Sequence, residues 1–142
     1  MRMLSRASLP WLVVAVLVGD AGADQRLAVI VHRDRAIDLT VAELSQIYLK
    51  KRRYWPDGGP IIPINRDAAS EIRARFSAAV FGPLVDRMAV YWKRLYFQGV
   101  LPPATLASAA AVKRFVASEP NAIGYVEADD VDDSVRVLFY LD

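Results

Sequence analysis

The stretch that decides the fold runs from Val41 to Ser70 and reads VAELSQIYLKKRRYWPDGGPIIPINRDAAS. It begins with a helical pattern, continues through a basic run and a turn, and ends in an arginine and a serine where a second helix should begin. A helix start offers unpaired backbone N–H groups and partial positive charge. The positions of Arg66 and Ser70 beside such a start therefore predict an oxyanion-binding site.

The segment before this stretch and its first helix have clear local patterns. Residues Leu27 to His32 form a continuous apolar run rich in β-branched side chains, which is typical of a strand covered on both faces and favours a parallel sheet. Thr40 stands three residues before Glu43, the spacing of a capping box. We expect the helix that follows to end near Lys50.

A second helix is expected after the short extended segment 61–64. Pro63 within that segment indicates an edge strand or the end of a strand. Asp67 is placed to cap the helix, and Glu71 and Arg75 have the i,i+4 spacing of an exposed ion pair.

The rest of the chain alternates between helical and extended patterns. We expect a helix over 84–96, another that begins at Ser108 or Thr105, and strands over 123–126 and 135–141. Strands separated by helices of this length predict an α/β protein with three layers, in which helices flank a mostly parallel sheet.

Composition describes one globular domain. The chain has 142 residues, of which 54% are hydrophobic and 24% charged, enough to bury a core. It has no cysteine, and His32 is its only histidine, which argues against disulfides and a zinc site. No nucleotide-binding, hydrolase or metalloprotease motif occurs, so we expect no enzyme, no cofactor and no metal.

The first 23 residues have the pattern of a signal peptide. Arg2 and Arg6 precede an apolar run over 9–18, and small residues end at Ala23, where we expect cleavage. A membrane anchor is the alternative, but the apolar run is shorter than the roughly 20 residues that a spanning helix needs. We therefore expect a signal peptide over 1–23, a periplasmic or otherwise exported domain over 24–142, and no stable membrane span after cleavage.

Net charge gives little support to nucleic-acid binding. The formal charge of the chain is +2, and it falls to +1 once Arg2, Arg6 and Asp20 leave with the signal peptide. Nucleic-acid-binding domains usually carry a strong basic excess on one face, so we expect no nucleic-acid partner.

Three segments resemble the phosphate-binding proteins that serve phosphate ABC transporters, within the type II periplasmic-binding-protein fold. They are LTVAELSQIYLKKRRYW at 39–55, NRDAAS at 65–70 and AVKRFVASEPNAIGYVE at 111–127. They stand in the family's order and span nearly all of the domain. The resemblance implies a type II periplasmic-binding-protein-like lobe. It also implies a short, single-lobe member, because the family's other lobe has no counterpart before Leu27.

The resemblance also implies a site. The family's phosphate-binding loop reads R-x-x-x-S-G-T, and Arg66 and Ser70 match its arginine and serine. Glu71 and Ile72 stand where the family has glycine and threonine, which removes a hydroxyl donor and adds a negative charge. Repulsion between that charge and a bound anion costs about 1 kcal/mol. We therefore expect weak binding of phosphate or a similar small oxyanion, with the ligand-binding set Asn65, Arg66, Asp67 and Ser70.

Two features of the sequence, the Arg66–Ser70 pair and the basic run 50–53, each allow an alternative interpretation. Arg66 could instead pair with Asp67 or Glu71 while Ser70 only caps the helix. The basic run 50–53, followed by two aromatic residues, could be a docking patch for an acidic partner or for anionic lipid headgroups, or simply a solvated helix end.

The sequence therefore predicts an exported, solute-binding-like protein whose partners are a small oxyanion and an envelope protein or ABC transporter component. The alternative is a non-catalytic protein-interaction module of the cell envelope that has lost solute binding and exposes an apolar patch.

Overall fold

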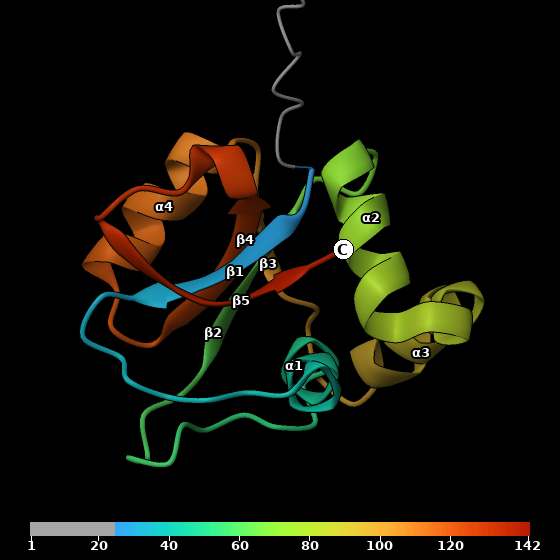
Figure 1. Cartoon of the computed structure of the whole chain (residues 1–142). Helices are drawn as coiled ribbons and strands as arrows, with labels where there is room; N and C mark the ends of the chain where they lie inside the picture. The colour runs from blue at the N-terminus through green and yellow to red at the C-terminus, as the bar shows by residue number, and fades with distance from the viewer. Residues whose placement is uncertain (1–24) are drawn as a thin grey trace, which may run out of the picture.

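The computed structural model describes residues 25–142, so the expected signal peptide lies outside the described residues. The described chain contains five strands, four α-helices and two short 3₁₀ segments, η1 and η2 (Figure 1). The elements are β1 Leu27–His32, α1 Val41–Tyr48, β2 Ile62–Arg66, α2 Glu71–Phe81, η1 Gly82–Arg87, α3 Met88–Tyr96, β3 Ala104–Leu106, α4 Ala109–Ser118, β4 Ala122–Glu127, η2 Ala128–Asp130 and β5 Val135–Leu141.

The five strands form one mixed sheet with the order β3-β2-β4-β1-β5. β2 pairs in parallel with β3 and β4, whereas β1 runs antiparallel to both of its neighbours, β4 and β5. Four strands therefore share one direction, and the predicted three-layer α/β fold with a mostly parallel sheet is confirmed. The apolar run at Leu27–His32 forms β1, which is covered on both faces, as expected. It is, however, the one strand of this sheet that runs antiparallel to the others.

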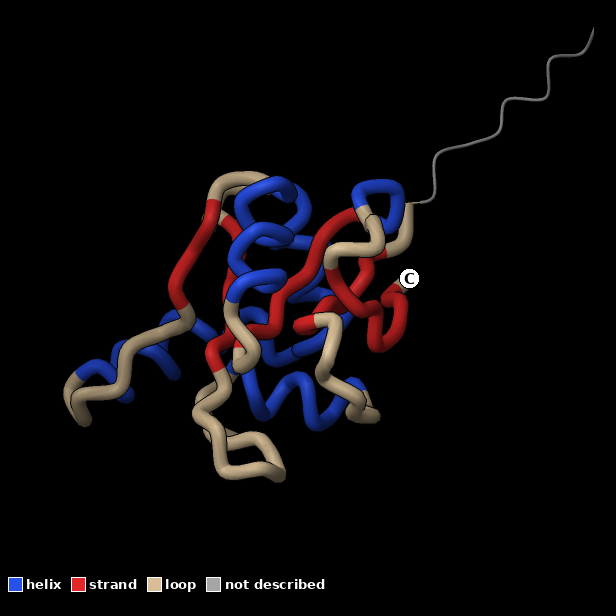
Figure 2. Tube along the Cα trace, turned by 90° about the vertical axis from the view of Figure 1, so that its left-hand side faces the viewer, coloured by secondary structure: helices blue, strands red, loops and turns tan. Residues whose placement is uncertain are grey.

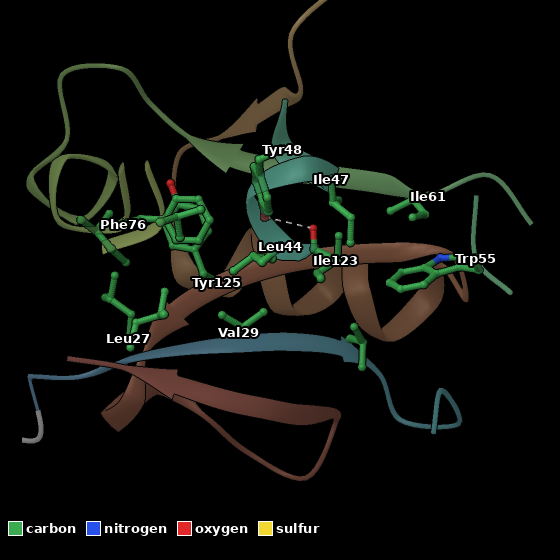
Figure 3. Packing of buried hydrophobic residues seen from close by; sticks show 14 residues of the cluster. Leu27, Val29, Leu44, Ile47, Tyr48, Trp55, Ile61, Phe76, Ile123 and Tyr125 are labelled. Atoms are coloured by element: carbon green, nitrogen blue, oxygen red, sulfur yellow. Dashed lines mark hydrogen bonds between the residues drawn. The ribbon is translucent and has the colours of Figure 1, made fainter. Parts of the chain in front are cut away.

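Helices cover both faces of the sheet. α1 and α2 pack on one face, and α4 packs on the other, as Figure 1 shows. On the first face, aromatic rings from α1, α2 and β4 meet at Tyr48, Phe76 and Tyr125 (Figure 3). The Phe76 and Tyr125 rings stack with centroids 3.8 Å apart, and Tyr48 meets Phe76 edge-on at 4.7 Å. This aromatic cluster lies directly beneath the end of β2.

Helix starts and ends follow local sequence signals in most places. Thr40 and Glu43 form the predicted capping box, and α1 ends at Tyr48, two residues before Lys50, which has a positive φ of 60°. Ser108 caps α4 by accepting from the Ala111 N–H, as one of the two alternatives predicted. Thr105, the other alternative, instead lies in β3, a three-residue strand that the sequence pattern did not indicate.

Three expectations about the middle of the chain are wrong. The helix expected over 84–96 is split, because a proline in the first turn after Gly82 leads into the 3₁₀ turn η1 before α3 begins. Asp67 does not cap α2, whose N-cap is Ser70. Arg75 pairs with Glu127 at 2.7 Å rather than with Glu71, because α2 packs its Arg75 side against the end of β4.

Pro63 lies near the start of β2, an inner strand of the sheet. β3 pairs with β2 only from Ile64 onward, so no neighbour on that side requires an N–H from Pro63. The proline therefore marks a strand end, which is one of the two interpretations that its position allowed.

Candidate functional site

The predicted site residues lie where β2 ends and α2 begins. Asn65, the next-to-last residue of β2, is 7% exposed and is the one buried polar residue of the described chain. Its Oδ1 accepts from the Arg66 N–H at 3.0 Å and from the Tyr125 hydroxyl. The hydroxyl of Tyr125 also accepts from the Arg66 N–H at 3.3 Å. Asn65 therefore holds the Arg66 backbone from inside the protein, with little of its surface exposed.

The Arg66 guanidinium keeps unused donors. Its Nη2 donates to the Ala107 carbonyl at 3.3 Å, while its Nε is buried and has no partner. Within residues 25–142, no ion pair joins Arg66 to Asp67 or Glu71, so the pairing considered as an alternative is absent. A buried N–H without an acceptor is costly unless a ligand or water completes it. This atom is the clearest sign of a missing acceptor in the described chain.

Ser70 is the N-cap of α2, but its side chain does not cap the helix. Its hydroxyl donates to the Asp67 carbonyl at 2.6 Å, and its N–H donates to the same carbonyl at 2.9 Å. These two bonds close a tight turn over 67–70. Because no side chain caps α2, the N–H groups of its first turn remain available. The serine therefore shapes the helix start, and the free donors there are backbone amides.

Sequence reasoning missed Arg73 as part of this region. Arg73 Nη1 donates to the Arg66 carbonyl at 3.0 Å, which brings a second guanidinium to the end of β2. Within residues 25–142, Arg73 also lacks an ion pair. The available signal was spacing, since Arg73 follows Ser70 by three residues and so lies on the same side of the first turn of α2.

Two acidic residues oppose these cations. Asp67 is exposed in the turn, and Glu71 is the exposed first residue of α2. Glu71 makes no ion pair within the described residues, because its expected partner Arg75 turns to Glu127. A carboxylate at a helix start interacts favourably with the macrodipole, so it also competes with any bound anion.

A cavity of about 260 Å³ lies beside Arg73. Asn65, Arg73 and Ser77 supply its polar lining. Tyr48, Phe81 and apolar side chains of η1, α3 and the 102–103 loop supply the rest. Arg73 therefore lies between this cavity and the start of α2. Arg66, Arg73 and the amides of the first turn of α2 together place positive groups at the junction of β2 and α2, which suits a compact anion.

The tyrosines below the site are held neutral. The buried Tyr48 hydroxyl donates to the Ile64 carbonyl at 2.8 Å. It also approaches the Ile123 carbonyl at 3.4 Å, the contact that Figure 3 marks with a dashed line. Burial raises the pKa of Tyr48 well above its usual value and raises the pKa of Tyr125 to about 12. Both hydroxyls therefore remain protonated at neutral pH and act as fixed donors at the end of β2.

Solved structures of phosphate-binding proteins share this fold. A protein from Clostridium perfringens, assigned as a phosphate ABC transporter substrate-binding protein and solved with bound phosphate, matches 82% of this chain with a TM-score of 0.67 and 26% identity. An ABC-type phosphate transport receptor from Vibrio cholerae matches 82% with a TM-score of 0.65 and 21% identity. PstS from Borrelia burgdorferi matches 82% with a TM-score of 0.64 and 16% identity.

These matches confirm the resemblance predicted from the sequence, and they confirm the type II periplasmic-binding-protein-like fold. The chain spans less than half the length of the proteins that it matches, between 45% and 47%. No protein-family model matches the chain. Within residues 25–142, the longest apolar helices fall short of what a membrane crossing requires.

Proposed function

We propose, from the likeness to phosphate ABC transporter substrate-binding proteins, that this chain is an exported, non-catalytic solute-binding protein that holds phosphate or a similar small oxyanion at the start of α2. The observation that carries the proposal is the Arg66 guanidinium, which has a buried Nε without an acceptor and no carboxylate partner within the described residues. Its neighbour Arg73 and the uncapped first turn of α2 supply further donors.

Each group has a distinct role in the proposed complex. Arg66 binds the anion through its free Nε–H and an adjacent Nη–H, which suit two oxygens of one phosphate. The N–H groups of the first turn of α2 donate to a third oxygen, where the helix dipole favours negative charge. Ser70 and Asp67 keep the turn in shape, and Asn65 fixes the direction of the Arg66 backbone.

Two features support weak rather than tight binding. Glu71 is placed at the helix start, where its repulsion of an anion costs about 1 kcal/mol. The turn over 67–69 is exposed, so solvent screens the charges on that side. A second surface that covered the site would exclude water and strengthen binding. We propose that an envelope protein, such as a component of an ABC transporter, supplies it.

Thermal unfolding in the presence of phosphate tests this proposal. A ligand that binds only the folded state at ten times its Kd stabilises it by about 1.4 kcal/mol, which raises Tm by roughly 5 °C for a domain of this size. We expect millimolar phosphate to raise Tm, with chloride at equal ionic strength as the control. Arg66→Ala should abolish the rise.

The matched control variant is Arg114→Ala, which removes an exposed arginine from α4 on the opposite face of the sheet. It should keep the full phosphate-dependent rise in Tm. If phosphate has no effect on the wild-type protein, or if Arg66→Ala responds as the wild type does, anion binding at this site is ruled out.

A further inference from the structure

We propose that the surface formed by the end of α1, α3 and the turn after α3 binds anionic lipid headgroups at a membrane surface. The name α3 surface is used here for Lys51, Val90, Lys93, Arg94, Phe97 and Leu101. This inference concerns a different part of the chain from the oxyanion site and does not depend on the proposed function.

The turn after α3 holds large apolar side chains in solvent. Phe97 is 79% exposed and Leu101 is 62% exposed, although both flank a well-ordered turn. Three backbone bonds close that turn, from the N–H groups of Gln98 and Val100 to the Leu95 carbonyl and from Gly99 to Tyr96. Figure 2 shows the connection between α3 and β3 projecting from the body of the protein. The exposed apolar side chains thus belong to a turn that is closed by its own backbone bonds, and Leu101 also lines an open hollow of about 430 Å³.

Cations alternate with these apolar residues along α3. Arg87, Val90, Arg94 and Phe97 are spaced by three, four and three residues, so they share one side of the helix. Val90 is 72% exposed. A helix side that combines protruding apolar residues with arginine and lysine is typical of segments that lie in a membrane interface.

The connection that follows α1 brings further positive side chains to the surface around α3. Tyr91 donates its hydroxyl to the Leu49 carbonyl at 2.5 Å, which joins the end of α1 to α3. Lys51 and Arg94 lie 5.9 Å and 5.7 Å from the Tyr91 ring. Burial, and then the nearby charge of Arg53, lower the pKa of Lys50, which begins the same basic run.

Acidic residues are almost absent from this region. The sequence has no aspartate or glutamate between Leu44 and Pro56, or between Arg87 and Ser118. Near α3, Asp86 lies at one end of a hollow of about 450 Å³ whose other charged lining residues are Lys51, Arg87 and Arg94. Such an unbalanced positive surface fits an anionic partner, and about 1 kcal/mol per lysine or arginine is typical near an anionic membrane.

A membrane fits these features better than an acidic protein does. Phe97 is the most exposed of these apolar side chains and lines neither of the open hollows to which Val90 and Leu101 contribute. A lipid interface accepts such a protruding side chain without a matching shape. Aromatic residues such as Phe97 and Tyr96, beside lysine and arginine, also suit the boundary between headgroups and acyl chains.

Vesicle co-sedimentation tests the proposal. The protein used is the chain from Asp24, which carries every described element, because the apolar run at 9–18 could bind vesicles by itself. We expect binding to vesicles that contain phosphatidylglycerol, little binding to vesicles of phosphatidylcholine alone, and weakening as salt rises. The double variant Lys93→Glu/Arg94→Glu should lower the partition coefficient more than tenfold, and so should Phe97→Ser.

Two control variants make the result specific. Arg114→Glu reverses an exposed charge on α4, and Tyr140→Ser removes an exposed aromatic ring from β5, so both should bind vesicles as the wild type does. Circular dichroism melts of all variants check that the fold is kept. Equal binding to both kinds of vesicle, no binding to either, or unchanged binding by the α3 variants would overturn the proposal. Binding to polyglutamate without binding to vesicles would also overturn it and assign the surface to an acidic protein.

Discussion

Replacing Tyr125 with phenylalanine tests how the core supports the candidate site. The hydroxyl of Tyr125 donates to Asn65 Oδ1 and accepts from the Arg66 N–H. Phenylalanine keeps the stack on Phe76 but loses both bonds, while Asn65 keeps its bond from Arg66. Losing the bonds of a buried hydroxyl costs about 1–2 kcal/mol. The free energy of unfolding at neutral pH should fall by that amount.

The same variant should change how stability depends on pH. The pKa of Tyr125 is about 12 in the folded protein, against about 10 in an unfolded chain. Because the folded-state pKa is the higher one, its contribution is complete below pH 10 and is lost as pH rises towards 12. By pH 11 the wild-type protein has lost about 1.4 kcal/mol through this group. Phenylalanine cannot ionise, so the stability gap between the two proteins should narrow by about that amount.

Urea unfolding at neutral pH and at pH 9 and 11 measures both effects. Burial, the larger cause of the raised pKa of Tyr48, is the same in both proteins, whereas the smaller effect of Tyr125 on Tyr48 is lost in the variant. The control is Tyr140→Phe, which removes a hydroxyl from a side chain that is 42% exposed and should follow the wild-type profile. A gap between the wild type and Tyr125→Phe that stays constant up to pH 11 would refute the account of a buried, neutral tyrosine.

Three further predictions follow from single contacts. Phe76→Ala removes a fully buried ring from the aromatic cluster and should lower the free energy of unfolding by about 3–5 kcal/mol, measured as a shift in the urea midpoint. Glu71→Gln removes the negative charge at the start of α2 and should raise phosphate affinity about fivefold by titration calorimetry, whereas an unchanged Kd would place the anion elsewhere. Thr40→Ala removes the capping box of α1 and should cost about 1 kcal/mol in the same urea assay.

Local signals in the sequence predicted the elements whose residues carry their own pattern. The capping box at Thr40 and the apolar extended run over Val135–Leu141 need no information from the rest of the chain. The strand β3 could not be found in this way, because two of its three residues are exposed and its pairing with β2 is the reason that it exists. The split of the helix over 84–96 follows the proline in the first turn after Gly82, a local signal that apolar periodicity alone does not record.

The candidate site was predictable only in part. Spacing and family likeness identified Arg66 and Ser70, and the structure puts both at the junction of β2 and α2. The sequence did not indicate that the Ser70 hydroxyl would be used inside its own turn. Nor could it show that Tyr125, 59 residues from Arg66, would hold the Arg66 backbone, since that contact depends on the register of β4 beside β2.

The most direct test of the central claim is an NMR titration of the chain from Asp24 with phosphate. The account predicts shifts of the backbone amides of Glu71, Ile72 and Arg73 and of the Arg66 Nε–H, because these donors would meet the anion. All of these shifts should fit a single Kd, which should be in the millimolar range or tighter. Shifts confined to other parts of the protein, or no movement of the Arg66 Nε–H at saturating phosphate, would contradict it.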